Sequence, residues 1–412
     1  MHTSSSNVSD SPNPEVVGVP LIDMSRQYQG LAGELTAAVT RVLDSGRFVL
    51  GPDCQQLEKS IAAYCHAPHA VACASGSDAI LLALMALGVG PGDEVILPSY
   101  TFFATAAAVV RLGGKPVFVD IDPATFNIDP RLIERAVTPS TKAIMPVHLF
   151  GQCADMDAIL AIAAQRKLTV IEDAAQAIGA EYKQRPAGSM GDVACFSFYP
   201  TKNLGGAGDG GMLTTRRQDV NDKLRLLHVH GMSPRYHHQV VGVNSRLDSL
   251  QAAVLNVKLP HLDRWTSLRQ LHARRYQELF AQQGLANVLG LPHESIEGRH
   301  VWNQYVVRVP DGKRDALREH LAKHKIGSEI YYPVPLHEQQ CFQYLNCKLG
   351  SLPQTEKAAR ETMALPIFPE LTIVEQQFVV RSIAAFFGVG APNRVPAPKF
   401  LQNAQPAERK HA

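Results

Sequence analysis

Three short polar segments lie beside apolar runs, where a parallel α/β sheet places its ligands. The first ends the apolar run LTVIED with Asp173. A partly buried carboxylate at such a strand end can pair with the protonated ring nitrogen of a bound cofactor. The same residue could instead cap a following helix. Asp173 is therefore a candidate partner for a cationic ring, with helix capping as the alternative.

The second segment, FSFYPTKN, places Lys202 just after another apolar run. Small residues (GGAGDGG, 205–211) follow it, and such a backbone can approach a ligand closely. A lysine in a polar loop is normally a solvated charge. A lysine withdrawn from water has a lowered pKa and becomes the nucleophile needed to form a Schiff base. Lys202 is a candidate for that role.

The third segment, ASGSDA at 74–79, immediately precedes an apolar helical run. Free N–H groups and the helix dipole make a helix N-terminus a possible phosphate site, here around Gly76, Ser77 and Asp78. Many helices that begin with Ser bind nothing. The three segments together are therefore more informative than any one of them.

The elements that must position these segments alternate between strand and helix from about residue 71 to 215. Apolar periodicity and Gly/Pro boundaries predict helices at 78–87, 102–112 and 155–167, and strand-like apolar segments at 94–97, 116–121, 143–149 and 168–172. Short strands separated by helices predict an α/β fold with a mostly parallel sheet covered on both faces.

The pattern changes near Asn244. A long helical stretch (249–283) is followed by a β-rich segment (301–309) and by helices at 314–325 and 375–387. We therefore predict a large domain over 15–258 and a smaller α+β domain over 259–390. The Ser-, Asn- and Pro-rich ends, 1–14 and 391–412, are predicted to be disordered.

Composition narrows the class of protein. The chain has 412 residues, 45% of them apolar and 19% charged, and a formal net charge of +2. That balance gives no sequence-independent attraction to nucleic acid or to an anionic membrane. We find no apolar stretch long enough to span a bilayer and no secretory signal, so we expect a cytoplasmic protein. The seven scattered cysteines, without a C-x-x-C pair, are expected to be reduced and mostly small buried hydrophobes.

The chain resembles the DegT/DnrJ/EryC1/StrS family of sugar aminotransferases, which depend on pyridoxal 5'-phosphate (PLP). The resemblance runs from about residue 20 to 387 and includes PGDEVILPSYTFFATAAAV, PVFVDIDPATFNIDP, AIMPVHLFGQ, VIEDAAQAIGA, GDVACFSFYPTKNLGGAGDGG, NSRLDSLQAAVLNVKLPHLD and YYPVPLHEQ. It implies PLP fold type I, the aspartate aminotransferase-like fold.

The resemblance also implies roles for single residues. Lys202 would hold PLP as a Schiff base, and Asp173 would pair with the pyridinium nitrogen. Gln176 would border the cofactor ring. Phe102 would stack on that ring, with ordinary helix core as the alternative.

For the cofactor phosphate, the resemblance implies contacts from Gly76, Ser77, Asp78 and Ser197. Asn244, in VGVNSRL, resembles a residue that reaches the phosphate from the neighbouring subunit. A homodimer with shared active sites is therefore implied, in agreement with the commonest oligomer symmetry.

The implied reaction transfers an amino group from an amino acid, by family habit L-glutamate, to a nucleotide-linked keto sugar, with Lys202 as the base. The motif wording is most similar to enzymes that aminate C3 of dTDP-3-keto-6-deoxyhexoses, with 4-keto sugars as the alternative. Tyr332 and His337 match positions near the sugar, or else are structural residues of a Pro-rich turn. Asn303 departs from the family, which often has His there, so the details of sugar contact are open.

Other readings are less well supported. Relatives that dehydrate or deoxygenate sugars lack the lysine, and a non-catalytic PLP-binding regulatory protein would not need Lys202, Asp173 and Gln176 together.

The glycine pattern at 206–211 does not open a helix, so it is not a dinucleotide site. The histidines of HVHGMSPRYHH (228–238) have no Cys or carboxylate at ligand spacing, and we expect no metal.

Overall fold

The computed structural model describes residues 18–294 and 298–389. The segments predicted to be disordered, 1–14 and 391–412, lie outside the described residues. None of the helices in the described part is both long and apolar enough to cross a membrane.

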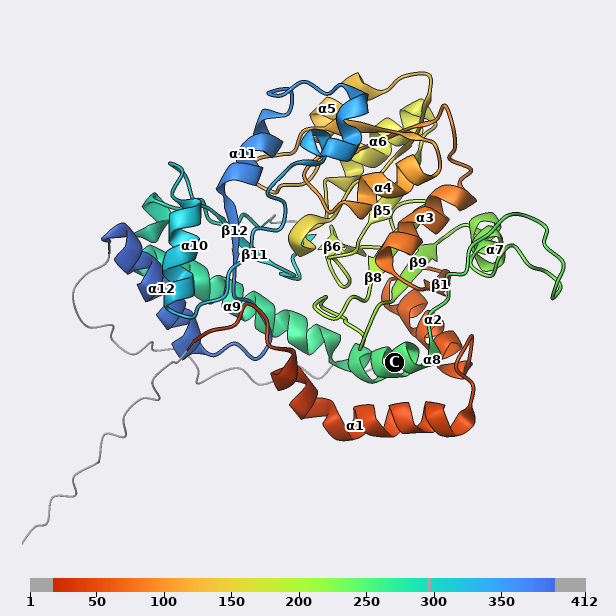
Figure 1. Cartoon of the computed structure of the whole chain (residues 1–412), viewed down its shortest axis with the longest axis horizontal. Helices are drawn as coiled ribbons and strands as arrows, with labels where there is room; N and C mark the ends of the chain where they lie inside the picture. The colour runs from red at the N-terminus through yellow and green to blue at the C-terminus, as the bar shows by residue number, and fades with distance from the viewer. Residues whose placement is uncertain (1–17, 295–297, 390–412) are drawn as a thin grey trace, which may run out of the picture.

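A seven-stranded sheet forms the centre of the larger part of the molecule (Figure 1). Its strand order is β1-β9-β8-β5-β4-β2-β3, and only β9 runs against the others. The strands are β1 (His69–Cys73), β2 (Glu94–Pro98), β3 (Lys115–Val119), β4 (Thr141–Ile144), β5 (Thr169–Asp173), β8 (Val193–Ser197) and β9 (Gly211–Thr215).

Helices cover both faces of this sheet, as the alternating pattern predicts. The helices on one face are α2 (Pro52–Tyr64), α5 (Pro130–Ala136), α6 (Met156–Arg166) and α8 (Ser249–Lys258). Those on the other are α3 (Gly76–Ala86), α4 (Ala104–Arg111) and α7 (Gln218–Leu227). Strand side chains alternate between the two cores: Ala194 and Phe196 of β8 face the first, Val193 and Cys195 the second.

The C-terminal part has its own apolar core around a two-stranded antiparallel sheet. Its elements are α9 (Leu262–Gln282), β11 (Tyr305–Arg308), α10 (Arg314–Lys323), β12 (Thr362–Leu365) and α12 (Ile373–Phe387). Another helix, α11 (Pro353–Glu361), instead packs against the larger part. The division between 258 and 259 stays a prediction, since Leu262 packs in the larger core and Val19 in the smaller one.

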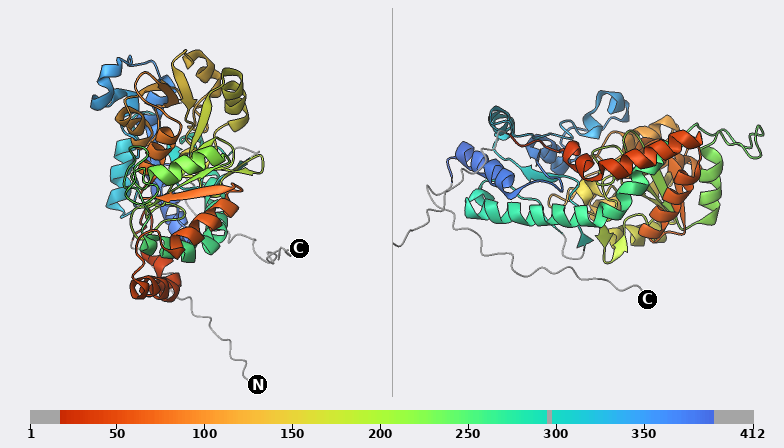
Figure 2. Two further views of the ribbon diagram at one scale, coloured as in Figure 1. Left: turned by 90° about the vertical axis from the view of Figure 1, so that its right-hand side faces the viewer. Right: turned by 90° about the horizontal axis from the view of Figure 1, so that it is seen from below.

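The remaining elements are peripheral. Helix α1 (Met24–Ser45) lies along the outside of the molecule next to α8 (Figures 1 and 2). A small sheet combines β6 (Glu181–Tyr182), β7 (Arg185–Pro186) and β10 (Gly298–Arg299). Short 3-10 turns occur at Leu149–Gly151, Leu259–His261, Leu285–Asn287, Leu336–Glu338 and Gln340–Leu345.

The structure differs from the expected elements in two places. The stretch 249–283 is two helices, α8 and α9, separated by a 3-10 turn that contains Pro260, which has no N–H to continue a helix. The segment 143–149 contains only the end of β4, because the chain then turns at His148 into Leu149–Gly151. All seven cysteines are free thiols, and two of them, Cys341 and Cys347, are exposed rather than buried.

Candidate functional site

Lys202 lies in the loop between β8 and β9, at the carboxyl end of β8. Its backbone N–H donates to the carbonyl of Tyr199 at 2.9 Å, which closes a tight turn around it. Burial lowers the pKa of its amine to about 8, and the nearby Asp173 carboxylate limits the shift. About a tenth of the amine is therefore uncharged at pH 7, far more than for an ordinary lysine, and the uncharged form is the nucleophile.

Asp173 ends β5, the strand beside β8, and its side chain is buried. The Thr105 hydroxyl donates to Oδ2 at 2.8 Å, and the Ala175 N–H donates to Oδ1 at 3.3 Å. Burial raises the pKa of Asp173, and these hydrogen bonds together with the Lys202 charge oppose the rise. Residues 174–180 form turns rather than a helix, so the helix-cap alternative is wrong.

A buried pair that sequence reasoning missed lies behind Asp173. His148 Nδ1 accepts the Ala154 N–H at 3.2 Å, so a neutral His148 carries its proton on Nε2 and donates it to Glu172 at 3.0 Å. The backbone N–H of His148 donates to the Asp173 carbonyl at 3.0 Å. Both residues follow or end neighbouring strands, the same signal that identified Asp173.

Glu172 also anchors the turn that leads into β8. Its carboxylate accepts the N–H groups of Gly188, Met190 and Gly191 at 2.7–3.0 Å. Burial would raise the pKa of Glu172, but the hydrogen bonds from His148 and the backbone outweigh burial and hold it below its usual range. The pair thus fixes the end of β5 that carries Asp173 and the turn that leads into β8.

The predicted phosphate segment begins α3 as expected. Ser75 is its N-cap and accepts the Asp78 N–H at 3.1 Å, so the N–H groups of Gly76 and Ser77 are the better donors for an anion. Gly76 lies against the end of β8, where an added Cβ would be 2.6 Å from the Ser197 Cβ. The helix start and Ser197 therefore meet at one place, as a shared anion site requires.

Phe102 lies just before α4 and is 60% exposed. The alternative that it belongs to the helix core is therefore wrong. Its neighbour Phe103 stacks on Phe342 with ring centroids 5.5 Å apart, which holds this segment in place. An exposed aromatic ring only three residues from Thr105, the donor to Asp173, is suited to cover a planar ligand.

Gln176 and Tyr332 are hydrogen-bonded to each other inside the protein. The Gln176 amide donates to the Tyr332 hydroxyl at 2.9 Å, and its oxygen accepts the Phe150 N–H at 2.6 Å. The Tyr332 and Phe150 rings stack with centroids 6.3 Å apart. The structure therefore brings Tyr332 to the residue predicted to border the cofactor.

His337 is buried behind the end of β2. Its Nδ1 lies 2.7 Å from the Ser99 hydroxyl, and its Nε2 lies 3.4 Å from the Glu356 carboxylate. His337, Glu338 and Glu356 form a close group of possible metal ligands, although Glu356 already accepts the Gly350 N–H at 2.7 Å. These contacts favour the structural alternative for His337, and its contact with sugar stays a prediction.

Asn244 is exposed and is followed by Ser245, whose hydroxyl accepts the Ala74 N–H at 3.1 Å beside the start of α3.

The glycine pattern at 206–211 leads into β9 rather than a helix, as expected. In the predicted histidine cluster, the His228 ring bonds to the Leu224 carbonyl and the His238 ring to the His230 carbonyl.

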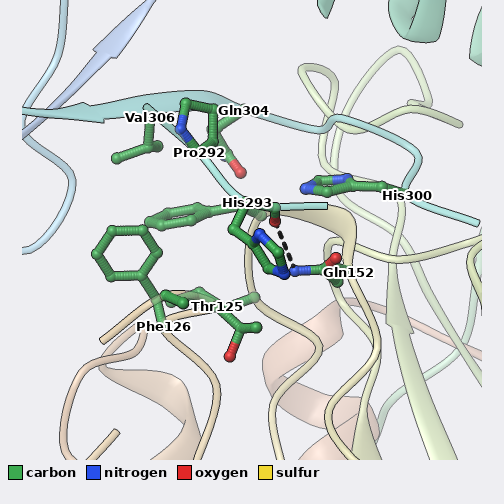
Figure 3. Close-up of a pocket in the computed structure, with 11 residues that line it drawn as sticks. Thr125, Phe126, Gln152, Pro292, His293, His300, Gln304 and Val306 are labelled. Carbon is green, nitrogen blue, oxygen red and sulfur yellow. Dashed lines mark hydrogen bonds between the residues drawn. The ribbon is translucent and has the colours of Figure 1, made fainter. Parts of the chain in front are cut away.

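Figure 3 shows a separate pocket between the two parts of the molecule. It is lined by Phe126, Gln152, His293, His300 and Gln304 among others. None of the predicted site residues lines it. This pocket is therefore distinct from the strand ends around Lys202, where the predicted catalytic residues lie.

The arrangement fits PLP on structural grounds. Among residues 18–294 and 298–389, no cationic side chain forms an ion pair with the buried Asp173 carboxylate, and Lys202 acts on it only through its charge, so a pyridinium nitrogen would give it a direct partner. The uncovered Phe102 ring and the α3 N-terminus beside Ser197 offer a ring surface and an anion site around the same strand ends.

Comparison with known proteins agrees with this geometry. The model of the DegT/DnrJ/EryC1/StrS aminotransferase family matches residues 30–384. A pleiotropic regulatory protein of Geobacillus stearothermophilus is 52% identical over 372 residues, which cover 90% of this chain and 99% of the relative. The dTDP-3-amino-3,4,6-trideoxy-alpha-D-glucose transaminase of Streptomyces venezuelae is 45% identical over 361 residues, covering 88% and 94%.

Among solved structures, ntda from Bacillus subtilis with bound cofactor PMP superposes with a TM-score of 0.84 at 34% identity, covering 91% of this chain and 87% of that one. PMP is the aminated form of PLP. These matches confirm the predicted fold class, enzyme class and cofactor. With a family model that spans most of its length, the chain belongs to the DegT/DnrJ/EryC1/StrS aminotransferase family.

Proposed function

We propose that this enzyme transfers the amino group of L-glutamate to C3 of a dTDP-linked 3-keto-6-deoxyhexose. The observation that carries the proposal is the buried Asp173 carboxylate at the end of β5, next to the loop that follows the neighbouring strand β8 and carries Lys202, whose pKa burial lowers to about 8. The 3-amino sugar named for the Streptomyces relative supports the position of amination. A 4-keto sugar is the second candidate.

The proposed role of each residue follows from the chemistry of its side chain. PLP, when bound, supplies an aldehyde that bonds to amines and a ring that accepts electrons while its nitrogen is protonated. Lys202 Nζ would hold the aldehyde carbon of the cofactor, and Asp173 Oδ would keep the ring nitrogen protonated. The amine of Lys202, when it is not bonded to the cofactor, would be the base that takes and returns the proton at the substrate carbon.

The other residues orient and bind. Gly76, Ser77, Asp78 and Ser197 are proposed to hold the phosphate at the α3 N-terminus, and Phe102 to cover the ring. Gln176 is proposed to border the ring on the side of Tyr332, to which it is bonded. Tyr332 and His337 are proposed to lie nearest the sugar.

Two experiments test this function. Borohydride reduction of the PLP-bound enzyme followed by peptide mass spectrometry should place a pyridoxyl group on Lys202, and labelling of a different lysine would overturn the assignment. A panel of dTDP- and UDP-linked 3-keto and 4-keto sugars, with NMR of the product, should give amination at C3. Amination at C4 would select the second candidate.

A homodimer with shared sites is part of the proposal. Exposed apolar residues lie in two segments of this region: Phe48 and Val49 are 45% and 51% exposed, and Val241, three residues before Asn244, is 91% exposed. The Ser249 N–H donates to the Phe48 carbonyl at 2.9 Å, which joins the two segments. An apolar surface of this kind beside the phosphate segment is suited to a second copy.

Subunit complementation tests the shared site. In a mixed dimer of Lys202→Ala and Asn244→Ala subunits, one site contains both defects and the other contains neither. Activity should therefore reappear on mixing two weakly active variants. If Asn244 served its own subunit, every site would carry one defect and mixing would restore nothing.

A non-catalytic regulatory protein is the candidate from another class, because the relative from Geobacillus stearothermophilus is named as a regulatory protein. The proposed Lys202 and Asp173 pair argues for turnover. Adding L-glutamate to the PLP-bound protein should convert its visible absorbance to that of the aminated cofactor. An unchanged spectrum would favour the regulatory role. We further propose that the enzyme acts in the cytoplasm.

A further inference from the structure

Lys258, the last residue of α8, is a buried lysine that the proposed chemistry does not use. It is 6% exposed, and none of the carboxylates in residues 18–294 and 298–389 forms an ion pair with it. Lysine is almost never buried without a partner, because the ammonium loses its hydration. The C-terminal end of the α8 dipole offsets only part of that cost. Such a residue needs a structural explanation.

A hydrogen bond to the Lys202 loop supplies the explanation. Lys258 Nζ donates to the carbonyl of Gly205 at 2.8 Å. Gly205 lies three residues after Lys202 in a loop that folds back on itself, since a Cβ on Gly205 would lie 2.1 Å from the Pro200 carbonyl oxygen. Lys258 therefore holds the far side of the turn that contains Lys202.

A second side chain of α8 holds the same loop. Gln251 lies seven residues, or two helical turns, before Lys258 and hence on the same face of α8. Its Oε1 accepts the Ala207 N–H at 2.8 Å. A Cβ on either Gly206 or Gly208 would lie within 3.0 Å of the Gln251 amide, so the loop runs directly over this side chain.

The helix is a firm support for these contacts. Ala252 and Leu255 of α8 are fully buried in the core beneath the sheet, and α8 also packs against α1 and α2 (Figure 1). One side chain binds a carbonyl of the loop and the other binds an N–H. The loop is thus held at two points by hydrogen bonds to side chains of α8 rather than to water.

We propose that Lys258 and Gln251 are positioning residues, which fix the 199–208 loop from α8 and so aim the Lys202 amine at its target. The inference rests on the proposed role of Lys202. The inference assigns a function to a buried lysine that contacts neither the predicted phosphate segment at the start of α3 nor Asp173. It also gives α8 a part in positioning a catalytic residue.

The test compares Lys258→Met with wild type, because methionine keeps most of the chain length and removes the charge and the donor. We expect the single-turnover rate with L-glutamate to fall about a hundredfold, as for a misplacement of about 1 Å, while KM for L-glutamate changes less than threefold. The pH midpoint of the visible absorbance of the lysine-bound cofactor should also shift. Lys258→Arg should recover part of the rate.

Lys223→Met is the matched control. Lys223 also donates to a backbone carbonyl, that of Ala86 at 3.2 Å, but at the opposite end of α3 from Gly76. We expect wild-type absorbance and rate. If Lys258→Met also keeps both, the inference is wrong. If Lys258→Met does not fold, Gln251→Met decides by the same measurements.

The outcome is separable from that of the proposed function. A borohydride-labelled Lys202 in wild type together with an unchanged Lys258→Met variant would overturn only the positioning role. An unlabelled Lys202 would overturn the proposed function itself. A fall in rate without any change in the absorbance titration would point to general destabilisation and would also count against positioning.

Discussion

The two sides of the site differ in how completely the protein itself holds them. On the inner side, Asp173 and Gln176 are buried and hydrogen-bonded, and the Lys202 loop is fixed by the backbone and by α8. On the outer side, Ser77, Phe102 and Asn244 are exposed and are accessible to a ligand or another chain. The first side is built within one chain, whereas the second is suited to be completed by ligands and a neighbouring subunit.

This contrast follows from what each side must do. Aligning a nucleophile and a charged carboxylate depends on preorganised polar groups in a site that excludes water. Admitting a bulky sugar nucleotide requires an open surface instead. Substitutions on the inner side should therefore damage turnover strongly, and those facing the sugar should alter binding mildly.

The largest effect is expected from Lys202→Ala. Without the amine there is no covalent attachment and no base, so amino transfer should fall by a factor on the order of 10³ or more. The visible absorbance of lysine-bound PLP should disappear. Lys115→Ala is the control. Lys115 is the first residue of the edge strand β3, so it lies at the amino ends of the strands, away from Lys202, and it pairs with Glu94. Substantial turnover by Lys202→Ala would contradict the inner-side assignment.

Asp173→Asn should have the next largest effect. The amide keeps the shape but cannot balance a pyridinium charge, so the ring loses its proton and its capacity to accept electrons. We expect retained cofactor and a rate lowered on the order of 10²–10³-fold, measured by single-turnover absorbance. Asp157→Asn, a surface carboxylate paired with Lys183, is the matched change and should behave as wild type.

The pH dependence of cofactor attachment should report the lowered pKa of Lys202. Only the neutral amine attacks an aldehyde, so the rate at which apoenzyme gains visible absorbance should rise about tenfold per pH unit below about 8. Above that pH it should level off. A midpoint near the ordinary lysine value of about 10.4 would show that the amine is not desolvated.

Much of the inner side was predictable from the sequence. Asp173 and Lys202 follow apolar runs, and the carboxyl ends of parallel strands meet at one edge, so their proximity follows from the alternating pattern. The His148 and Glu172 pair carries the same signal, since its members follow or end neighbouring strands, but it was not among the residues predicted. The contact of Lys258 with Gly205 was not predictable, because it joins a helix and a loop 53 positions apart and local periodicity carries no information on such a pair.

The outer side was predicted less well for a physical reason. The exposure of Phe102 depends on how the chain enters α4, and the apolar sequence there left helix core as the alternative to ring stacking. The burial of His337 depends on Ser99 and Glu356, which are distant in sequence. Surface and loop positions are set by tertiary contacts rather than by pattern.

Tyr332→Phe should have the smallest effect, and it sharpens the contrast because Tyr332 joins the two sides. Loss of its hydroxyl leaves the buried Gln176 amide without its acceptor, which should lower the free energy of unfolding by about 1 kcal/mol. The half-reaction with L-glutamate should stay within about twofold of wild type, while KM for the keto sugar rises several-fold. Urea unfolding and separate half-reaction kinetics measure these quantities. A greater loss in the L-glutamate half-reaction than in sugar binding would place Tyr332 on the inner side instead, with Gln176 as the residue through which it acts.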